Sequence, residues 1–241
     1  MECVILCAGY ATRLYPLTLD KPKALLPING TPLLSHIIKK IPESIENITI
    51  VSNEKFFPHF CSWAETHPRK TYILNDRTSS NESRLGGIGD LFFAIENKPI
   101  NDNLLVILGD NFFDFDLENF INFFNSVNCT TLGVCSLKDQ DLRNLGVVEV
   151  SEGKIISFEE KPINPKSELA AIGIYAFTRN DLLFIREYMK TELPKDGPGF
   201  LIKYFLSRKS VHSFIFKGNW FDIGSKEIYS RINNELNDTW N

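Results

Sequence analysis

The sequence predicts an α/β fold, a single domain of three layers whose central sheet is mostly parallel and gains antiparallel strands in its second half. In the first half, short and continuously apolar segments alternate with segments of helical periodicity, which is typical of a parallel sheet covered on both faces. In the second half, strand-like segments follow one another with less helix between them. No Ser/Gly-rich linker, repeat or block of charge divides the chain, so we expect one domain over residues 1–241.

The first half supplies the parallel part of the predicted sheet. Its strands are apolar runs, expected at residues 4–7, 48–51, 72–74 and 104–108. Its helices carry apolar residues three and four positions apart, as one buried helix face requires. They are expected at about residues 32–40, 56–65, 88–95 and 117–124.

The second half begins with strands and ends with helices around one further strand. The strands are expected at residues 131–136, 147–150, 155–158, 171–177 and 211–216. The segment Ser151-Glu152-Gly153-Lys154 is typical of a hairpin turn between two of them. The helices are expected at about residues 181–188 and 200–206, and from about Lys226 onward.

Composition excludes several classes of protein. The chain has 241 residues, is 43% hydrophobic and carries a net charge of −4, which argues against a disordered chain and against a nucleic-acid binder with a basic face. No apolar run approaches the roughly 20 residues of a membrane span, and the apolar start is too short for a signal peptide. The five cysteines show no CxxC spacing. We therefore expect reduced thiols in a cytoplasmic protein that binds neither nucleic acid nor membrane.

A glycine-containing loop follows the first predicted strand. Backbone N–H groups in such a loop form an anion-binding concavity beyond the carboxyl end of the strand. Arg13 and Lys23 add cations nearby. The dinucleotide motif GxGxxG and the P-loop motif GK[ST] are both missing here. Taken alone, Gly9 fits a tight turn between strand and helix better than an anion-binding loop, with Arg13 and Lys23 as ordinary surface charges.

The whole run changes that interpretation. Residues 9–27 read GYATRLYPLTLDKPKALLP and resemble, over 19 positions without a gap, the signature G-x-G-T-R-L-x-P-L-T-x-x-x-P-K-x-L-x-P of the sugar-1-phosphate nucleotidyltransferases. The resemblance implies a Rossmann-like fold of the nucleotide-diphospho-sugar transferase type. It also implies nucleotide contacts from Ala8, Gly9, Tyr10, Ala11, Thr12, Arg13 and Lys23. Ala11 replaces the second glycine, and we expect this position to need a small side chain rather than a positive φ.

Two aspartates follow strand-like segments far apart in the sequence. Asp110 comes after the apolar run 104–108, and Asp222 lies 112 positions later in the segment WFDIG. Taken alone, Asp110 fits a helix cap or turn equally well, and Asp222 fits a cap before the last helix better. Both match aspartates of the family, so the resemblance implies that they hold Mg²⁺, which prefers one or two carboxylates with phosphate oxygens.

The resemblance extends to the base and acceptor sites. Gly86 and Gly87, which alone read as a flexible helix entry, match glycines that approach the base. The segment Glu159-Glu160-Lys161-Pro162 alone reads as a charged turn, but the family carries E-E-K-P at its sugar-phosphate site. The implied acceptor-binding residues are Gly146, Glu160, Lys161 and Gly173.

Together these motifs predict a Mg²⁺-dependent nucleotidyltransferase. A sugar-1-phosphate would attack the α-phosphorus of a nucleoside triphosphate, with Arg13, Lys23 and Asp110 as catalytic residues. The nucleotide-binding half would run to about residue 128 and the acceptor-binding half from about 129 to 241. We expect a single activity, because the sequence holds no further domain of the kind that some relatives carry.

Several alternatives stay open at this stage. One is a cytidylyltransferase acting on phosphocholine or another phosphorylated acceptor. Another is a non-catalytic regulatory subunit on the same fold, although such relatives usually lose the charged residues that this chain keeps. The resemblance favours thymidylyl or uridylyl transfer over guanylyl or cytidylyl transfer without deciding between them. It also leaves a homo-oligomer open, since relatives often form dimers or tetramers.

Overall fold

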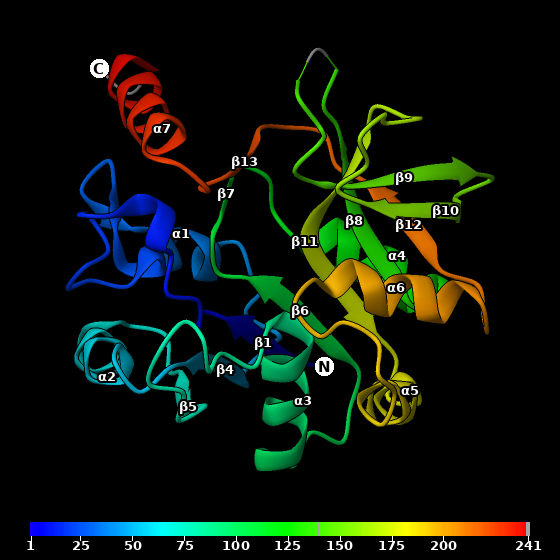
Figure 1. Cartoon of the computed structure of the whole chain (residues 1–241), viewed down its shortest axis with the longest axis horizontal. Coiled ribbons are helices and arrows are strands. Elements are labelled where there is room, and N and C mark those ends of the chain that lie inside the picture. The colour runs from blue at the N-terminus through cyan, green and yellow to red at the C-terminus, as the bar shows by residue number, and fades with distance from the viewer. Residues whose placement is uncertain (139, 240–241) are drawn as a thin grey trace.

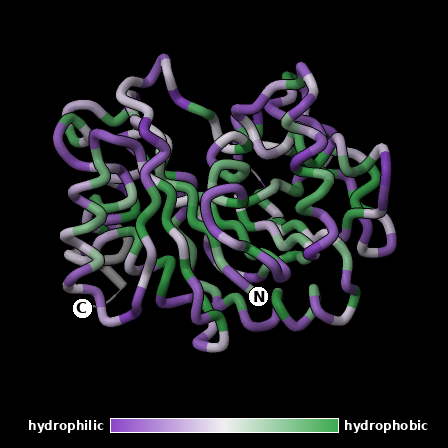
Figure 2. The backbone as a smooth tube through the Cα atoms, turned by 90° about the horizontal axis from the view of Figure 1, so that it is seen from below, coloured by the Kyte–Doolittle hydropathy of each residue, from purple (hydrophilic) through white to green (hydrophobic). Residues whose placement is uncertain are grey.

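The fold is built around one large twisted sheet. The computed structural model describes residues 1–138 and 140–239. In this part of the chain, nine strands form the sheet in the order β5-β4-β1-β6-β11-β8-β12-β10-β9 (Figure 1). Helices pack against it along both faces, and apolar segments run through the interior while the outer loops are mainly hydrophilic (Figure 2).

All nine predicted strands are confirmed, with ends that differ by up to two residues. They are β1 (Glu2–Leu6), β4 (Ile48–Ser52), β5 (Tyr72–Asn75), β6 (Leu104–Leu108), β8 (Thr131–Ser136), β9 (Gly146–Ser151), β10 (Lys154–Glu160), β11 (Leu169–Phe177) and β12 (His212–Ile215). The predicted hairpin turn joins β9 to β10, where Ser151 pairs with Lys154 and the residues between them have positive φ.

The predicted helices are confirmed as well. They are α1 (Leu33–Lys39), α2 (Phe57–Thr66), α3 (Gly87–Asn97), α4 (Glu118–Val127), α5 (Asp181–Met189), α6 (Pro198–Leu206) and α7 (Lys226–Thr239). Two short 3₁₀ turns, Thr12–Leu14 and Lys23–Leu25, follow β1 and place Arg13 and Lys23.

The sheet is mixed, with a parallel first half to which antiparallel strands are added in the second half, as predicted. Strands β5, β4, β1 and β6 run parallel. Strand β11 is antiparallel to both β6 and β8, β12 is parallel to β8, and β10 is antiparallel to β12 and β9. Strand β11 is buried over most of its length. It therefore reads as a continuous apolar run, a pattern that is shared by parallel strands and by antiparallel strands buried on both faces.

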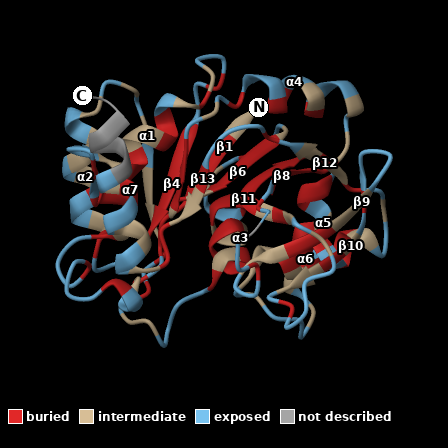
Figure 3. Ribbon diagram, turned by 90° about the horizontal axis from the view of Figure 1, so that it is seen from above, coloured by how far each residue is buried: buried red, intermediate tan, exposed pale blue. Residues whose placement is uncertain are grey.

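Two separate apolar cores lie on the two faces of the sheet. Successive residues of β1 alternate between them, so that Cys3 and Ile5 belong to one core and Val4 and Leu6 to the other, as the strand period of two demands. Helices α1, α2 and α4 bury their apolar sides in the first core, and α3, α5 and α6 in the second. The central strands are accordingly buried between the helices (Figure 3).

Two short strand pairs lie outside the main sheet. Strand β2 (Pro27–Ile28) pairs with β3 (Thr31–Pro32), and β7 (Asn111–Phe113) pairs antiparallel with β13 (Trp220–Asp222). The β7–β13 pair joins two segments that are about a hundred residues apart in sequence. It sets Asp222 opposite Asn111, and the Ile223 amide donates to the Asp110 carbonyl oxygen at 2.9 Å. This pairing therefore brings the two predicted metal ligands together.

Two further observations concern features expected from composition. Among the described residues, no helix has the length and apolar character needed to cross a bilayer. The five cysteines are free thiols, and Cys3, Cys7 and Cys135 are buried.

Candidate active site

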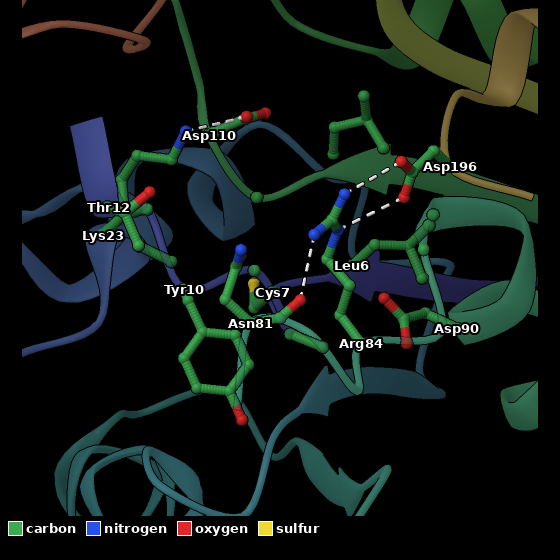
Figure 4. A pocket seen from close by; sticks show the side chains of 18 of the residues that line it. Leu6, Cys7, Tyr10, Thr12, Lys23, Asn81, Arg84, Asp90, Asp110 and Asp196 are labelled. Carbon is green, nitrogen blue, oxygen red and sulfur yellow. Dashed lines mark hydrogen bonds and ion pairs between the residues drawn. The ribbon is translucent and has the colours of Figure 1, made fainter. Parts of the chain in front are cut away.

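A cavity of about 520 Å³ opens beyond the carboxyl ends of β1 and β6. These two strands are neighbours in the sheet, and their connections leave in opposite directions, which is where open α/β sheets form ligand crevices. The cavity is lined by every residue predicted to contact the nucleotide, namely Ala8, Gly9, Tyr10, Ala11, Thr12, Arg13, Lys23, Gly86, Gly87 and Asp110. Figure 4 shows Tyr10, Thr12, Lys23 and Asp110 among the lining side chains.

Hydrogen bonds from the rest of the protein hold one side of the glycine loop, and its other side faces the cavity. The Ala8 carbonyl oxygen accepts a hydrogen bond from Asn53 Nδ2 at 2.8 Å, and the buried Tyr10 hydroxyl donates to the Thr78 carbonyl oxygen at 2.8 Å. A Cβ atom built on Gly9 would have no described atom within 4 Å. The loop is therefore fixed on its protein side and exposes backbone toward the cavity, as an anion-binding loop requires.

The expectation for Ala11 is wrong. Ala11 has φ 48° and ψ 42°, so the position does need the left-handed backbone conformation that glycine adopts most easily. The Thr18 hydroxyl donates to the Ala11 carbonyl oxygen at 2.8 Å and helps to hold the turn. Because a non-glycine residue in this conformation costs roughly 1–2 kcal/mol, the loop carries local strain at this residue.

We expect Ala11→Gly to raise the free energy of unfolding by about 0.5–1 kcal/mol. Relief of the left-handed conformation outweighs the greater chain entropy of glycine, which costs about 0.5–1 kcal/mol. Denaturant unfolding would measure the change. The matched control is Ala64→Gly within α2, which we expect to lower stability by a similar amount. A loss of stability in Ala11→Gly equal to that of the control would contradict the assignment of strain.

The two glycines at the start of α3 make room for protein backbone. Gly86 has φ 80°, and a Cβ atom there would lie 2.8 Å from the Asp196 Cα and the Lys195 carbonyl oxygen. The Gly87 and Ile88 amides donate to the carbonyl oxygens of Asp196 and Lys195, each at 2.9 Å. A loop from the second half of the chain therefore closes one side of the cavity, and Asp196 lines it.

Acidic and basic side chains lie close together beside the glycine loop. Lys23 Nζ lies 2.9 Å from Asp110 Oδ2 in a partly buried ion pair. Burial, and secondly the negative charge of Asp110, raise the pKa of Asp222 to about 6, against the opposing charges of Lys23, Arg13 and Lys161. Two carboxylates and three cations therefore share one small region, a pattern typical of sites that bind several charged groups.

A second cavity, of about 120 Å³, adjoins the first at Asp110. Gly146, Glu160 and Gly173, which the sequence assigned to the acceptor, line it together with Asp222. Lys161 does not line it, although the charge of Lys161 contributes to the pKa values of Glu160 and Asp222.

Two glycines of this cavity accept no side chain. A Cβ atom on Gly146 would lie 2.4 Å from the Phe158 ring, and one on Gly173, where φ is 69°, would lie 2.5 Å from Asn111 Nδ2. Such distances are far below van der Waals contact. Larger residues at either position would therefore displace the walls of the cavity.

The sequence prediction missed part of this cavity. A Cβ atom on Gly199, at the start of α6, would lie 2.1 Å from Glu160 Oε2. Because glycine has no side chain, the Glu160 carboxylate can lie against the N-terminus of this helix. Burial raises the pKa of Glu160 in this position. The indole Nε1 of Trp220 is buried beside the same cavity and has no hydrogen-bond partner within residues 1–138 and 140–239. The segment Gly197-Pro198-Gly199 was the signal that could have drawn attention to α6.

A model of the family described as nucleotidyl transferase matches residues 2–239. The chain belongs to the nucleotidyl transferase family. The resemblance drawn from residues 9–27 is thus confirmed at the level of the family, and the two adjoining cavities are features of a member of this family.

Individual relatives differ in the substrates that their names state. The chain is 32% identical to the "Bifunctional protein GlmU" of Methanocaldococcus jannaschii, over 98% of the chain and 56% of the relative. It is 30% identical to a "Putative mannose-1-phosphate guanyltransferase" of Sulfolobus acidocaldarius, over 98% of the chain and 63% of the relative. The chain thus spans 56% and 63% of the lengths of these curated relatives.

Solved structures share the architecture. A structure titled as a "Putative Glucose-1-Phosphate Thymidylyltransferase" from Bacillus anthracis matches with a TM-score of 0.85 at 26% identity, over 99% of this chain and 96% of that one. A UDP-glucose pyrophosphorylase structure matches with a TM-score of 0.83 at 20% identity, over 100% of this chain and 99% of that one. The Rossmann-like α/β fold predicted from the sequence is therefore the fold of these nucleotidyl transferases.

Proposed function

We propose that this nucleotidyl transferase joins a nucleoside triphosphate to a sugar-1-phosphate and releases pyrophosphate. The observation that carries the proposal is the meeting of two cavities at Asp110. The larger has the volume and anion-binding loop suited to a triphosphate, and the smaller has a buried carboxylate, Glu160, suited to sugar hydroxyl groups. A reaction between two substrates needs such a shared boundary, because the reacting atoms must touch there.

The roles follow from where the residues lie. The amides of residues 9–12 and the Arg13 guanidinium would hold the departing pyrophosphate, and Lys23 would neutralise charge on the reacting phosphates. Gly146, Glu160, Lys161 and Gly173 would bind the acceptor. The nucleotide half would then end near residue 128, although Asp196 from the acceptor half also lines the nucleotide cavity.

The proposed reaction requires the protein only to position the two substrates and to neutralise charge. A sugar-1-phosphate is already an anion near neutral pH, so no general base has to remove a proton before its oxygen attacks the α-phosphorus in line. The barrier is electrostatic repulsion between two phosphates. Lys23, which pairs with Asp110, and Arg13, whose charge acts on Asp222, would lower this barrier by neutralising developing charge.

Asp110 and Asp222 fit a magnesium ion. They are two carboxylates held close enough for the charge of one to raise the pKa of the other, and a dication between them would relieve that repulsion. Magnesium ions in such enzymes are bound by one or two carboxylates and complete their shell with phosphate oxygens and water. When bound, the ion would supply positive charge to the triphosphate and orient it.

A grid of substrates tests the proposal. Pyrophosphate release would be measured with Mg²⁺ for five nucleoside triphosphates, each combined with glucose-1-phosphate, mannose-1-phosphate and phosphocholine. We expect one strong pair containing a sugar phosphate. A strong pair with phosphocholine would contradict the sugar assignment, and a folded protein that neither turns over nor binds any triphosphate would contradict the proposed function altogether.

A further inference from the structure

The start of α6 borders both cavities. Asp196, in the loop before the helix, lines the nucleotide cavity, while Pro198 and Gly199, the first two residues of α6, line the smaller cavity proposed for the acceptor. Helix α6 packs against β10, the strand that ends at Glu160 (Figure 1). The start of this helix is therefore a wall that the two proposed substrates share.

Gly199 is buried and has no room for a side chain. A Cβ atom there would lie 2.1 Å from Glu160 Oε2 and 2.4 Å from Cε1 of the Phe158 ring. Both distances are far below the roughly 3.5 Å that separates atoms in contact. The Glu160 carboxylate thus lies in the space that a side chain at position 199 would occupy.

Of the groups around this space, the Glu160 side chain is the one that can move most easily. The Phe158 ring is buried and also lies against Gly146, where a Cβ atom would be 2.4 Å from it. The loop before α6 is held by α3, because the Gly87 amide donates to the Asp196 carbonyl oxygen at 2.9 Å. A methyl group added at position 199 would therefore displace the carboxylate, which is the end of a flexible side chain.

The Glu160 carboxylate is placed to meet a ligand. No donor from the described part of the chain hydrogen-bonds to its oxygens, although Lys161 and Lys203 act on it through their charges. An ionised carboxylate offers two acceptor oxygens, which suit the hydroxyl groups of a sugar. We propose, resting on the proposed function, that Gly199 is a positioning residue, which keeps open the space from which the Glu160 carboxylate binds the acceptor.

Gly199→Ala should weaken acceptor binding and leave triphosphate binding unchanged. With the sugar phosphate of the strong pair, glucose-1-phosphate or mannose-1-phosphate, we expect KM to rise at least about tenfold. We expect kcat to stay within about threefold, because hydroxyl contacts bind the ground state and the transition state alike. The affinity for the triphosphate, measured by calorimetry, should stay within about twofold.

Gly197→Ala is the matched control. It adds the same methyl group to the same segment, but a Cβ atom there would lie 3.4 Å from the Glu160 carboxylate, which is ordinary contact. We expect its KM for the sugar phosphate to stay within about twofold of that of the unsubstituted protein. An effect equal to that of Gly199→Ala would overturn the inference.

A double-mutant cycle shows whether Gly199 acts through Glu160. In Glu160→Ala the carboxylate is gone, so adding Gly199→Ala should change KM by less than about twofold. A further rise as large as in the unsubstituted background would overturn the inference. So would an unchanged KM in folded Gly199→Ala, or a loss of triphosphate affinity equal to the loss of acceptor affinity.

A second pair of variants covers the case in which crowding of the Phe158 ring unfolds Gly199→Ala. Phe158→Leu would then be compared with Phe158→Leu combined with Gly199→Ala, because leucine removes the ring from the shared space. Equal KM values in these two would overturn the positioning role. The proposed function fails separately, if the unsubstituted protein turns over no sugar phosphate at all.

Discussion

Asp110→Asn should abolish nucleotidyl transfer and leave the fold intact. The substitution removes one of the two carboxylate charges at the junction of the cavities and the partner of Lys23. Loss of a single electrostatic contact to a reacting group typically costs 10²–10³ in rate, and we expect at least about 10³ here because both effects combine. The rate of pyrophosphate release at saturating substrates and Mg²⁺ would measure it.

The fold should survive because Asp110 contributes little to stability. Its side chain is 35% exposed, and a partly exposed ion pair is worth little. The backbone contact from Ile223 to the Asp110 carbonyl oxygen does not involve the side chain. The matched control is Asp116→Asn, an exposed aspartate on the same segment that pairs with Lys40, and we expect no change in rate. Near-normal Mg²⁺-dependent turnover by Asp110→Asn would remove this residue from the site.

Lys23→Ala should slow transfer by about 3 kcal/mol of transition-state stabilisation, which is roughly 150-fold. Lys23 Nζ is mostly buried, at 16% side-chain exposure, and is held at 2.9 Å from Asp110. A cation fixed in place before the reaction needs no reorganisation when charge develops on the phosphates. Because this charge grows in the transition state, most of the loss should appear in kcat, as single-turnover kinetics would show.

Lys21→Ala is the matched control for this prediction. Lys21 is exposed, lies two residues earlier in the same loop and lines a different groove, beside α2. We expect its rate to stay within about twofold, because a solvent-exposed charge is well screened. If the two variants were slowed equally, the general positive charge of the loop, and not the position of Lys23, would explain the effect.

Most of the secondary structure could be predicted because the local signals are strong. The apolar run of β6, Leu104–Leu108, has the ends that the sequence predicted, and α1, α2 and α5 begin within one residue of expectation. The alternation of buried strands and amphipathic helices depends only on spacing along the chain. Clustering of the predicted nucleotide contacts around one cavity follows, because the loops after β1 and β6 emerge at the same edge of the sheet.

What could not be predicted depends on contacts between distant segments. The place of β11 between β6 and β8 is set by contacts with these strands and leaves no mark on its apolar sequence. Gly86 lines the cavity, as expected of a residue predicted to contact the base, but its close approach to the backbone at Asp196, 110 positions later, could not be predicted. The left-handed conformation of Ala11 was also missed, because alanine gives no local sign that the turn demands a positive φ.

The pairing of β7 with β13 has a consequence for the newly made chain. Asp110 leaves the ribosome long before Asp222, which lies 112 positions later in β13. The glycine loop and Lys23 are complete early, and the sheet around β1 needs only residues up to β6 for its parallel part. A nascent chain would therefore gain the proposed phosphate-binding surface before it gains its second acidic residue. Because contacts of such long sequence separation form slowly, the proposed chemistry would wait until β13 has been made and has paired with β7.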